Sequence, residues 1–114
     1  ATGAALFAII NSPATPATQS IKGSAGRIIA VYALNNSASV RWLKIFNTVT
    51  PTLGSTAAVL DIPIPPNSSE PISIQLEGGL SFGTAIVIAV TGAKGTTDNT
   101  AITLNDVGGF IAYQ

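Results

Sequence analysis

The sequence predicts an all-β protein: a single-domain antiparallel β-sandwich, jelly-roll-like, with about eight strands. Eleven glycines and seven prolines interrupt the chain every few residues. The segments between them are rich in Ile, Val, Thr and aromatic residues, which favour strands, and signals for helices are almost absent. A chain of 114 residues has room for one domain with its own hydrophobic core.

The expected strands follow one another with turn residues between them. They span residues 7–10, 27–34, 39–48, 57–64, 71–77, 83–91, 100–104 and 110–113. Many short strands with this regular punctuation are typical of a sandwich or jelly roll. Several connections are too long for simple hairpins, which favours Greek-key crossovers over an up-and-down barrel.

Two segments carry further structural predictions. Segment 71–77 alternates apolar and polar residues, so one of its faces should be buried, and Gly78 and Gly79 should end the strand. Segment 57–64 ends among prolines, which cannot donate to a ladder of backbone hydrogen bonds. We therefore expect it to be an edge strand.

Segments 27–34 and 39–48 are expected to form a hairpin across the turn at 35–37, because Asn tolerates the backbone conformations of tight turns. Both segments are apolar or mixed on both faces, whereas a sheet open to solvent on one side alternates cleanly. We predict that other subunits cover the outer face of this pair. The long apolar segment 83–91 is predicted to be a buried strand.

The first part of the chain is predicted to be an extended N-terminal strand or arm, residues 1–20, followed by the sandwich domain, residues 21–114. Segment 4–10 is apolar, and 11–20 is rich in Pro, Thr and Ser. A strand of this kind can reach a neighbouring subunit and add to its sheet.

The composition is short of charge. The chain has 5 Lys+Arg and 5 Asp+Glu, so 9% of its residues are charged and the formal net charge is zero. Soluble domains carry about 25% charged residues, and surface charge keeps small domains apart. We therefore predict a subunit packed against others. The cations are scattered and no apolar run reaches the ~18–20 residues of a membrane helix, so neither nucleic acid nor membrane is expected as a partner.

The same composition argues against catalysis. The chain has no His and no Cys, which removes the commonest general base, the commonest metal ligand and every thiolate. We expect no catalytic residue, metal or cofactor. The remaining acids are Asp61, Glu70, Glu77, Asp98 and Asp106, which we expect at turns and strand ends. Asp61 lies within an apolar strand, where we expect it to pair with an Arg or to face an interface, and a structural salt bridge is favoured over catalysis.

Eight residues are candidates for contact with other subunits, because they lie on the apolar N-terminal strand or on the two-sided segments. They are Leu6, Phe7, Ile9, Ile10, Tyr32, Arg41, Leu43 and Ile45.

The central and C-terminal stretches resemble a family. The segments concerned are 41–48 (Arg-Trp-Leu-Lys-Ile-Phe-Asn-Thr), 50–56, 59–66 (Val-Leu-Asp-Ile-Pro-Ile-Pro-Pro), 80–86, 89–92 and 97–101 (Thr-Asp-Asn-Thr-Ala). Together they are similar to small β-rich virion structural proteins of tailed bacteriophages. The resemblance covers roughly residues 38–114, and its motifs are structural.

What the resemblance implies is a non-enzymatic virion component, most simply a capsid decoration (cement) protein. Such a protein would be made in the host cytoplasm, form a homotrimer, bind the major capsid protein on the capsid surface and stabilise the head by subunit contacts. The alternative is a tail, baseplate or fibre component, or an adhesin-like module that binds a cell-surface glycan near Asp98 and Asn99.

Overall fold

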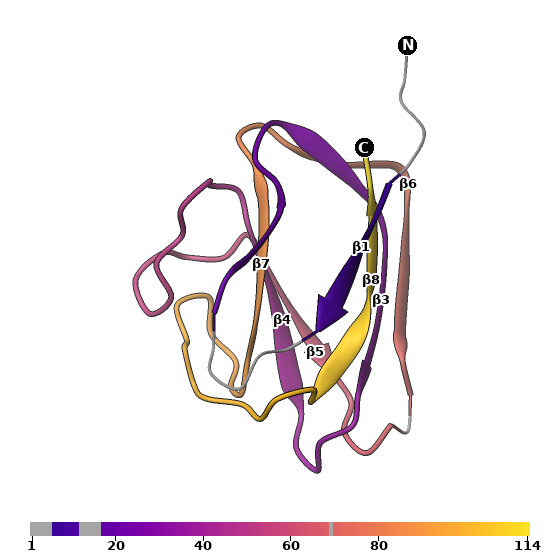
Figure 1. Ribbon diagram of the computed structural model, residues 1–114, viewed down its shortest axis with the longest axis vertical. Helices are drawn as coiled ribbons and strands as arrows, with labels where there is room; N and C mark the ends of the chain where they lie inside the picture. The colour runs from indigo at the N-terminus through magenta and orange to yellow at the C-terminus, as the bar shows by residue number, and fades with distance from the viewer. Residues whose placement is uncertain (1–5, 12–16, 69) are drawn as a thin grey trace.

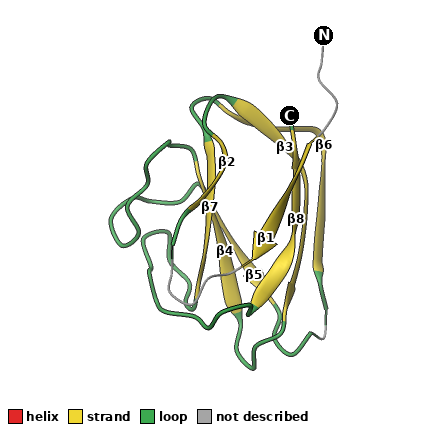
Figure 2. Ribbon diagram, in the orientation of Figure 1, coloured by secondary structure: helices red, strands yellow, loops and turns green. Residues whose placement is uncertain are grey.

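The computed structural model describes residues 6–11, 17–68 and 70–114 and contains eight strands in this part of the chain (Figures 1 and 2). The strands are β1 (Leu6–Asn11), β2 (Gln19–Lys22), β3 (Gly26–Asn35), β4 (Arg41–Phe46), β5 (Leu60–Ile64), β6 (Ile72–Phe82), β7 (Ile86–Thr91) and β8 (Val107–Tyr113). The described residues contain no helix. The prediction of an all-β fold with about eight strands is confirmed.

The strands form two antiparallel sheets of four that pack face to face as a β-sandwich (Figure 1). Sheet A has the order β1-β8-β3-β6, and sheet B has the order β2-β7-β4-β5. The first strand pairs with the last, the second with the seventh, the third with the sixth and the fourth with the fifth. A long hairpin rolled into two layers gives this order, which is that of a jelly roll. The expected crossovers are therefore present, and β5 is an edge strand as predicted.

The core lies between the two sheets. It consists of the inward side chains of alternate strand residues, among them Ile28 and Val31 from β3, Leu43 and Ile45 from β4, and Ile111 from β8. Each such side chain contributes about 1.5–3 kcal/mol when it leaves water. Residues Ile72 and Ile74 of β6 pack against this core, as the alternation of segment 71–77 predicts.

The expected hairpin between segments 27–34 and 39–48 is wrong. β3 belongs to sheet A and β4 to sheet B, so the chain crosses from one layer to the other at Asn35. The Asn35 side chain is fully buried there. Its Nδ2 donates to the Ser39 and Ile64 carbonyl oxygens at 2.8 and 3.1 Å, and its Oδ1 accepts from the amide and hydroxyl of Ser37. These bonds replace the ladder that a hairpin would have made.

Two further strand predictions are wrong. Segment 100–104 is a loop, because Asp98 and Asp106 side chains accept the Thr100 and Thr103 amides that a ladder would use. The eighth strand is instead β2. Gly78 and Gly79 do not end β6. Both adopt positive φ (77° and 80°), a conformation that glycine accepts without strain. The strand therefore continues past them, and its register with β3 shifts at this point.

The predicted N-terminal arm is part of the sandwich where the structure describes it. β1 pairs with β8 of the same chain along its full length, from Leu6 opposite Tyr113 to Asn11 opposite Gly108. Gln19 and Ser20 belong to β2. The boundary expected at residue 20 therefore does not separate two structural units, and residues 1–5 and 12–16 lie outside the described residues.

Gly109 marks the tightest backbone approach in sheet A. It faces the core from β8, with φ 153°, and a Cβ placed on it would lie 1.9 Å from the Tyr32 carbonyl oxygen of β3. Gly108 lies next to it on the opposite face, where a Cβ would meet its nearest atom, the Ile10 carbonyl oxygen, at 3.8 Å.

We therefore expect Gly109→Ala to cost more than about 4 kcal/mol of unfolding free energy, because β8 and β3 must separate to accept the methyl group. Gly108→Ala is the matched control and should change it by less than about 1 kcal/mol. Urea denaturation followed by Trp42 fluorescence measures both. Equal stability of the two variants would contradict this packing.

Candidate interaction surface

The outer face of sheet A carries apolar side chains in register on three neighbouring strands. Ile9 of β1 lies opposite Phe110 of β8, which lies opposite Tyr32 of β3. The next row places Phe7 and Ala30 on either side of Ala112. Because side chains alternate along a strand, residues two apart share a face. The apolar face is defined here as Phe7, Ile9, Ala30, Tyr32, Phe110 and Ala112.

Phe110 is the centre of this surface. Its ring stacks on Tyr32, with centroids 5.6 Å apart and an angle of 13° between the planes. It also meets the Phe7 ring edge to face, at 5.4 Å and 89°. Each contact of this kind is worth about 0.5–1.5 kcal/mol beyond the area it buries. Phe110 therefore links the Phe7 and Tyr32 rings across β1, β8 and β3.

The apolar face is open to solvent in the part of the chain that the structure describes. Phe7 is 70% exposed and Ile9 is 73% exposed, the two highest values among the exposed large apolar side chains. Tyr32 and Phe110 are each about one-third exposed. The four side chains Phe7, Ile9, Tyr32 and Phe110 together present roughly 400 Å² of apolar surface. A patch of this size on a small protein is often an interaction site.

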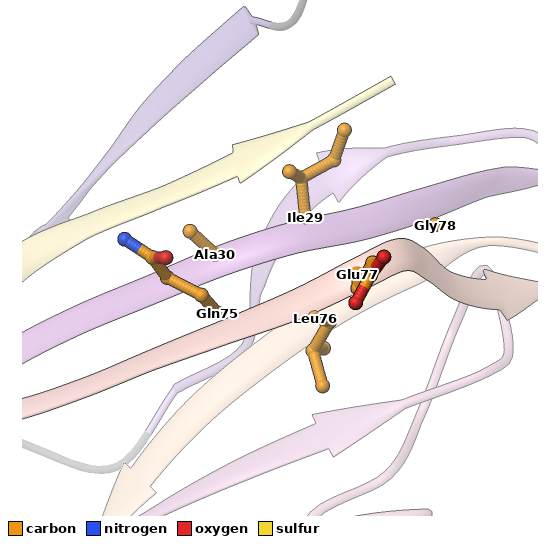
Figure 3. A pocket seen from close by; sticks show the side chains of 6 residues that line it. All are labelled: Ile29, Ala30, Gln75, Leu76, Glu77 and Gly78. Carbon is orange, nitrogen blue, oxygen red and sulfur yellow. The ribbon is translucent and has the colours of Figure 1, made fainter.

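No charged side chain belongs to the apolar face. The nearest charges in sheet A stand beyond it, where Arg27 donates to the Gly78 carbonyl oxygen and Glu77 ends the alternating part of β6. A shallow groove of about 580 Å³ runs along this margin between β3 and β6, lined by Ile29, Ala30, Gln75, Leu76, Glu77 and Gly78 (Figure 3). Gln75 lies opposite Ala30, so the groove adjoins the apolar face.

The outer face of sheet B is different, because the chain covers it with its own loops. The connection 47–59 and the start of the connection 92–106 lie on the side of sheet B that faces away from sheet A (Figure 2), whereas Ile102 of the second connection packs into the core between the sheets. Leu53 and Ala58 of the first loop pack against Phe46, Val87 and Ala89 as a second small core. Because the core between the sheets covers the other side of β7, all six of its residues are buried. The buried strand predicted over 83–91 is therefore confirmed for β7, whereas Gly83 and Thr84 are exposed.

A buried ion pair fastens the second loop to sheet B. Lys44 has no exposed surface, and its Nζ lies 2.8 Å from Asp61 Oδ1, across the β4–β5 ladder. Nζ also donates to the Ala93 carbonyl oxygen at 3.1 Å, and Asp61 Oδ2 accepts the Gly95 amide at 2.8 Å. The structural salt bridge expected for Asp61 is confirmed, but its partner is Lys44 and not an arginine.

Of the other carboxylates, Asp106 and Asp98 accept hydrogen bonds from neighbouring groups, and Glu70 and Glu77 are exposed. Asp106 pairs with Arg41 Nε at 2.9 Å. Partial burial of Asp98 acts to raise the pKa of its carboxyl, but hydrogen bonds from the Thr100 hydroxyl and amide outweigh it, so that this pKa is lowered. Among the described residues, no three acidic side chains come together as a metal-binding group.

The structure divides the eight predicted contact residues into three groups. Leu6, Phe7, Ile9 and Tyr32 are exposed on sheet A. Arg41 is half-buried in its ion pair with Asp106.

The third group does not reach the surface. Ile10, Leu43 and Ile45 are buried between the sheets, because their strand positions point inward. The prediction that other subunits cover the outer face of segment 39–48 is wrong, because loops of the same chain cover it.

The sequence interpretation missed Phe110, the residue at the centre of the apolar face. A signal for it exists, since Val107, Gly109 and Ile111 alternate with Gly108, Phe110 and Ala112. That alternation predicts that Phe110 lies opposite to the core-facing Ile111. The short interval assigned to the last strand, 110–113, hid the pattern.

Comparisons with known proteins add no relatives: no family model, no curated protein and no solved structure matches the chain. In the described part of the chain, the structure contains no helix with the length and apolar character to span a membrane.

The Lys44–Asp61 pair is testable by removing one partner at a time. Asp61→Ala leaves the Lys44 ammonium buried without its counter-charge and should cost about 3–5 kcal/mol of unfolding free energy. Lys44→Met leaves a carboxylate that solvent reaches and should cost clearly less. Urea denaturation of both variants gives the comparison. A smaller loss for Asp61→Ala than for Lys44→Met would contradict the assignment of Lys44 as the dependent partner.

Proposed function

We propose that this chain is a non-enzymatic structural protein of a phage virion, a decoration protein that attaches to the capsid through the apolar face of sheet A. The observation that carries the proposal is the contrast between the two outer faces. The chain covers the face of sheet B with its own loops and leaves Phe7, Ile9, Tyr32 and Phe110 exposed on sheet A. An uncharged, aromatic surface on an otherwise closed sandwich is suited to permanent contact.

The fold and the composition support the same class of function. Jelly rolls occur in viral capsid and lectin domains, although a fold by itself does not decide a function. The resemblance of residues 38–114 to phage structural proteins favours the capsid. The small charged fraction, 9%, is unusual for a free domain and is expected of a subunit that stays associated.

The positions of the acids support a structural role. Asp61 and Asp106 neutralise Lys44 and Arg41, and Asp98 closes its own turn with Thr100. These three carboxylates hold the long loops in place. The alternative of a glycan-binding module near Asp98 and Asn99 is less well supported, because the Asp98 oxygens already accept hydrogen bonds from Thr100.

The stabilisation that attachment gives to the capsid can be estimated from the apolar area that it buries. Covering roughly 400 Å² of apolar surface gives about 10 kcal/mol of gross stabilisation, from which the cost of association must be subtracted. Many copies bound across the seams of a shell would resist its expansion. The major capsid protein as partner, the homotrimer and the position on the capsid surface stay predictions of the resemblance.

The proposal is tested by binding the purified chain to empty heads of the phage that encodes it. Tyr32→Lys places a charge in the middle of the apolar face and should weaken binding at least about 100-fold, because that charge must be desolvated at the seam. Val49→Lys, a change at an exposed loop residue, is the matched control and should bind normally. Far-ultraviolet circular dichroism checks that both variants are folded.

Two outcomes would contradict the proposal. If the wild-type chain does not bind heads, the decoration function is wrong. If folded Tyr32→Lys binds as well as the wild type, the apolar face is not the attachment surface.

A further inference from the structure

The sandwich has four edge strands, and three of them carry features that oppose pairing with another strand. β5 contains Pro63 within its five residues, and Pro65 and Pro66 follow it. β2 has only four residues, carries Lys22 and pairs irregularly with β7. Proline, charge, short length and irregular pairing are the means by which natural edges avoid adding further strands.

β6, the far edge of sheet A, is protected as well. Pro71 precedes it, Glu77 lies in its middle, and Gly78 and Gly79 distort it where its register with β3 shifts. A strand aligned with one half of β6 would lose its register at the other half.

β1 has none of these protections. It is six residues long, contains no proline and no charge, and pairs with β8 without any shift in register. In the described part of the chain its other edge has no strand beside it. Gln19 Nε2 donates a hydrogen bond to the Ile9 carbonyl oxygen at 2.8 Å. An edge of this kind is suited to take up another strand.

We infer that β1 is the self-association edge of this protein, and that its occupant is β1 of a second copy, paired antiparallel across a two-fold axis. The axis would pass near Ala8, so that Phe7 of one copy lies opposite Ile9 of the other. Aromatic residues opposite β-branched residues are favourable cross-strand pairs. The two four-stranded sheets A become one eight-stranded sheet, and their apolar faces join into one surface.

A second copy fits this edge better than a charged partner does. β1 carries no charge that could select a complementary protein, and the formal net charge of zero means that two copies do not repel one another. Because the other three edges are protected, each copy offers one usable edge. One edge per copy gives a closed dimer, whereas a growing filament needs two. The inference goes beyond the proposed function, since it concerns self-association and not attachment to a head, and it replaces the homotrimer that the resemblance implies with a dimer.

Opposite charges on β1 test the inference. Phe7→Lys/Ile9→Lys places lysines opposite lysines in the proposed pair, and Phe7→Glu/Ile9→Glu does the same with acids. Both positions are largely exposed, so the monomer should keep its fold. By sedimentation equilibrium, the wild type should be a dimer, each variant alone should dissociate at least about 100-fold more readily, and an equimolar mixture should dimerise again.

The matched control is Val49→Lys/Leu104→Lys, which changes two exposed apolar residues outside sheet A and should leave the dimer intact. A monomeric or trimeric wild type would overturn the inference, and so would a Lys variant that still dimerises. Failure of the Lys and Glu variants to pair with each other would also overturn it, because a contact between two β1 strands predicts their rescue.

A cross-link gives the register. The chain has no native Cys, so introduced thiols react without background. Air oxidation of Phe7→Cys mixed with Ile9→Cys should give more disulfide-linked heterodimer than either variant gives homodimer. A preference for homodimers would overturn the proposed axis. Head binding is measured separately, so a dimer that binds no heads contradicts only the proposed function, and a head-binding monomer contradicts only this inference.

Discussion

The attachment of the loop after β7 to sheet B depends on the buried ion pair between Lys44 and Asp61. A fully buried ammonium is costly unless its charge and its donors are satisfied. Here one carboxylate and the Ala93 carbonyl oxygen meet Nζ, and the second oxygen of the same carboxylate accepts the Gly95 amide. The pair therefore joins β4, β5 and the loop after β7 in one polar contact. That contact holds a long loop, which has no strand of its own, against the outer face of sheet B.

The two outer faces of the sandwich differ although the strands that form them look alike. Phe46 on sheet B and Phe110 on sheet A are both outward-facing aromatic residues at strand positions. Phe46 is buried, because Leu53 and Ala58 pack over the same side of sheet B. Phe110 is covered only in part by Phe7 and Tyr32, its neighbours in the same sheet. The difference arises from the loops and not from the strands.

This difference also explains how far the sequence could predict the structure. Alternation and turn residues predicted the fold class and most strands, because both are local properties of the chain. The partner of each strand is not local: Asn35 was expected to close a hairpin, and its buried amide instead connects the two layers. Leu43 and Ile45 were expected at a subunit contact for a related reason. Apolar residues on both faces of a strand indicate that both are covered, but they do not say whether the same chain provides the cover.

The shortage of charge acquires a more specific meaning from these contacts. Four of the ten charged side chains form two ion pairs inside the chain, Lys44 with Asp61 and Arg41 with Asp106. Arg27 donates to a backbone oxygen of β6. These charged side chains thus hold loops and the distorted part of β6 in place. β1 and the apolar face contain no charged residue. Since charge on edges and faces is what keeps β-proteins apart, its absence from β1 and the apolar face, beside three protected edges, is the feature on which the proposed contacts at this side of the molecule rest.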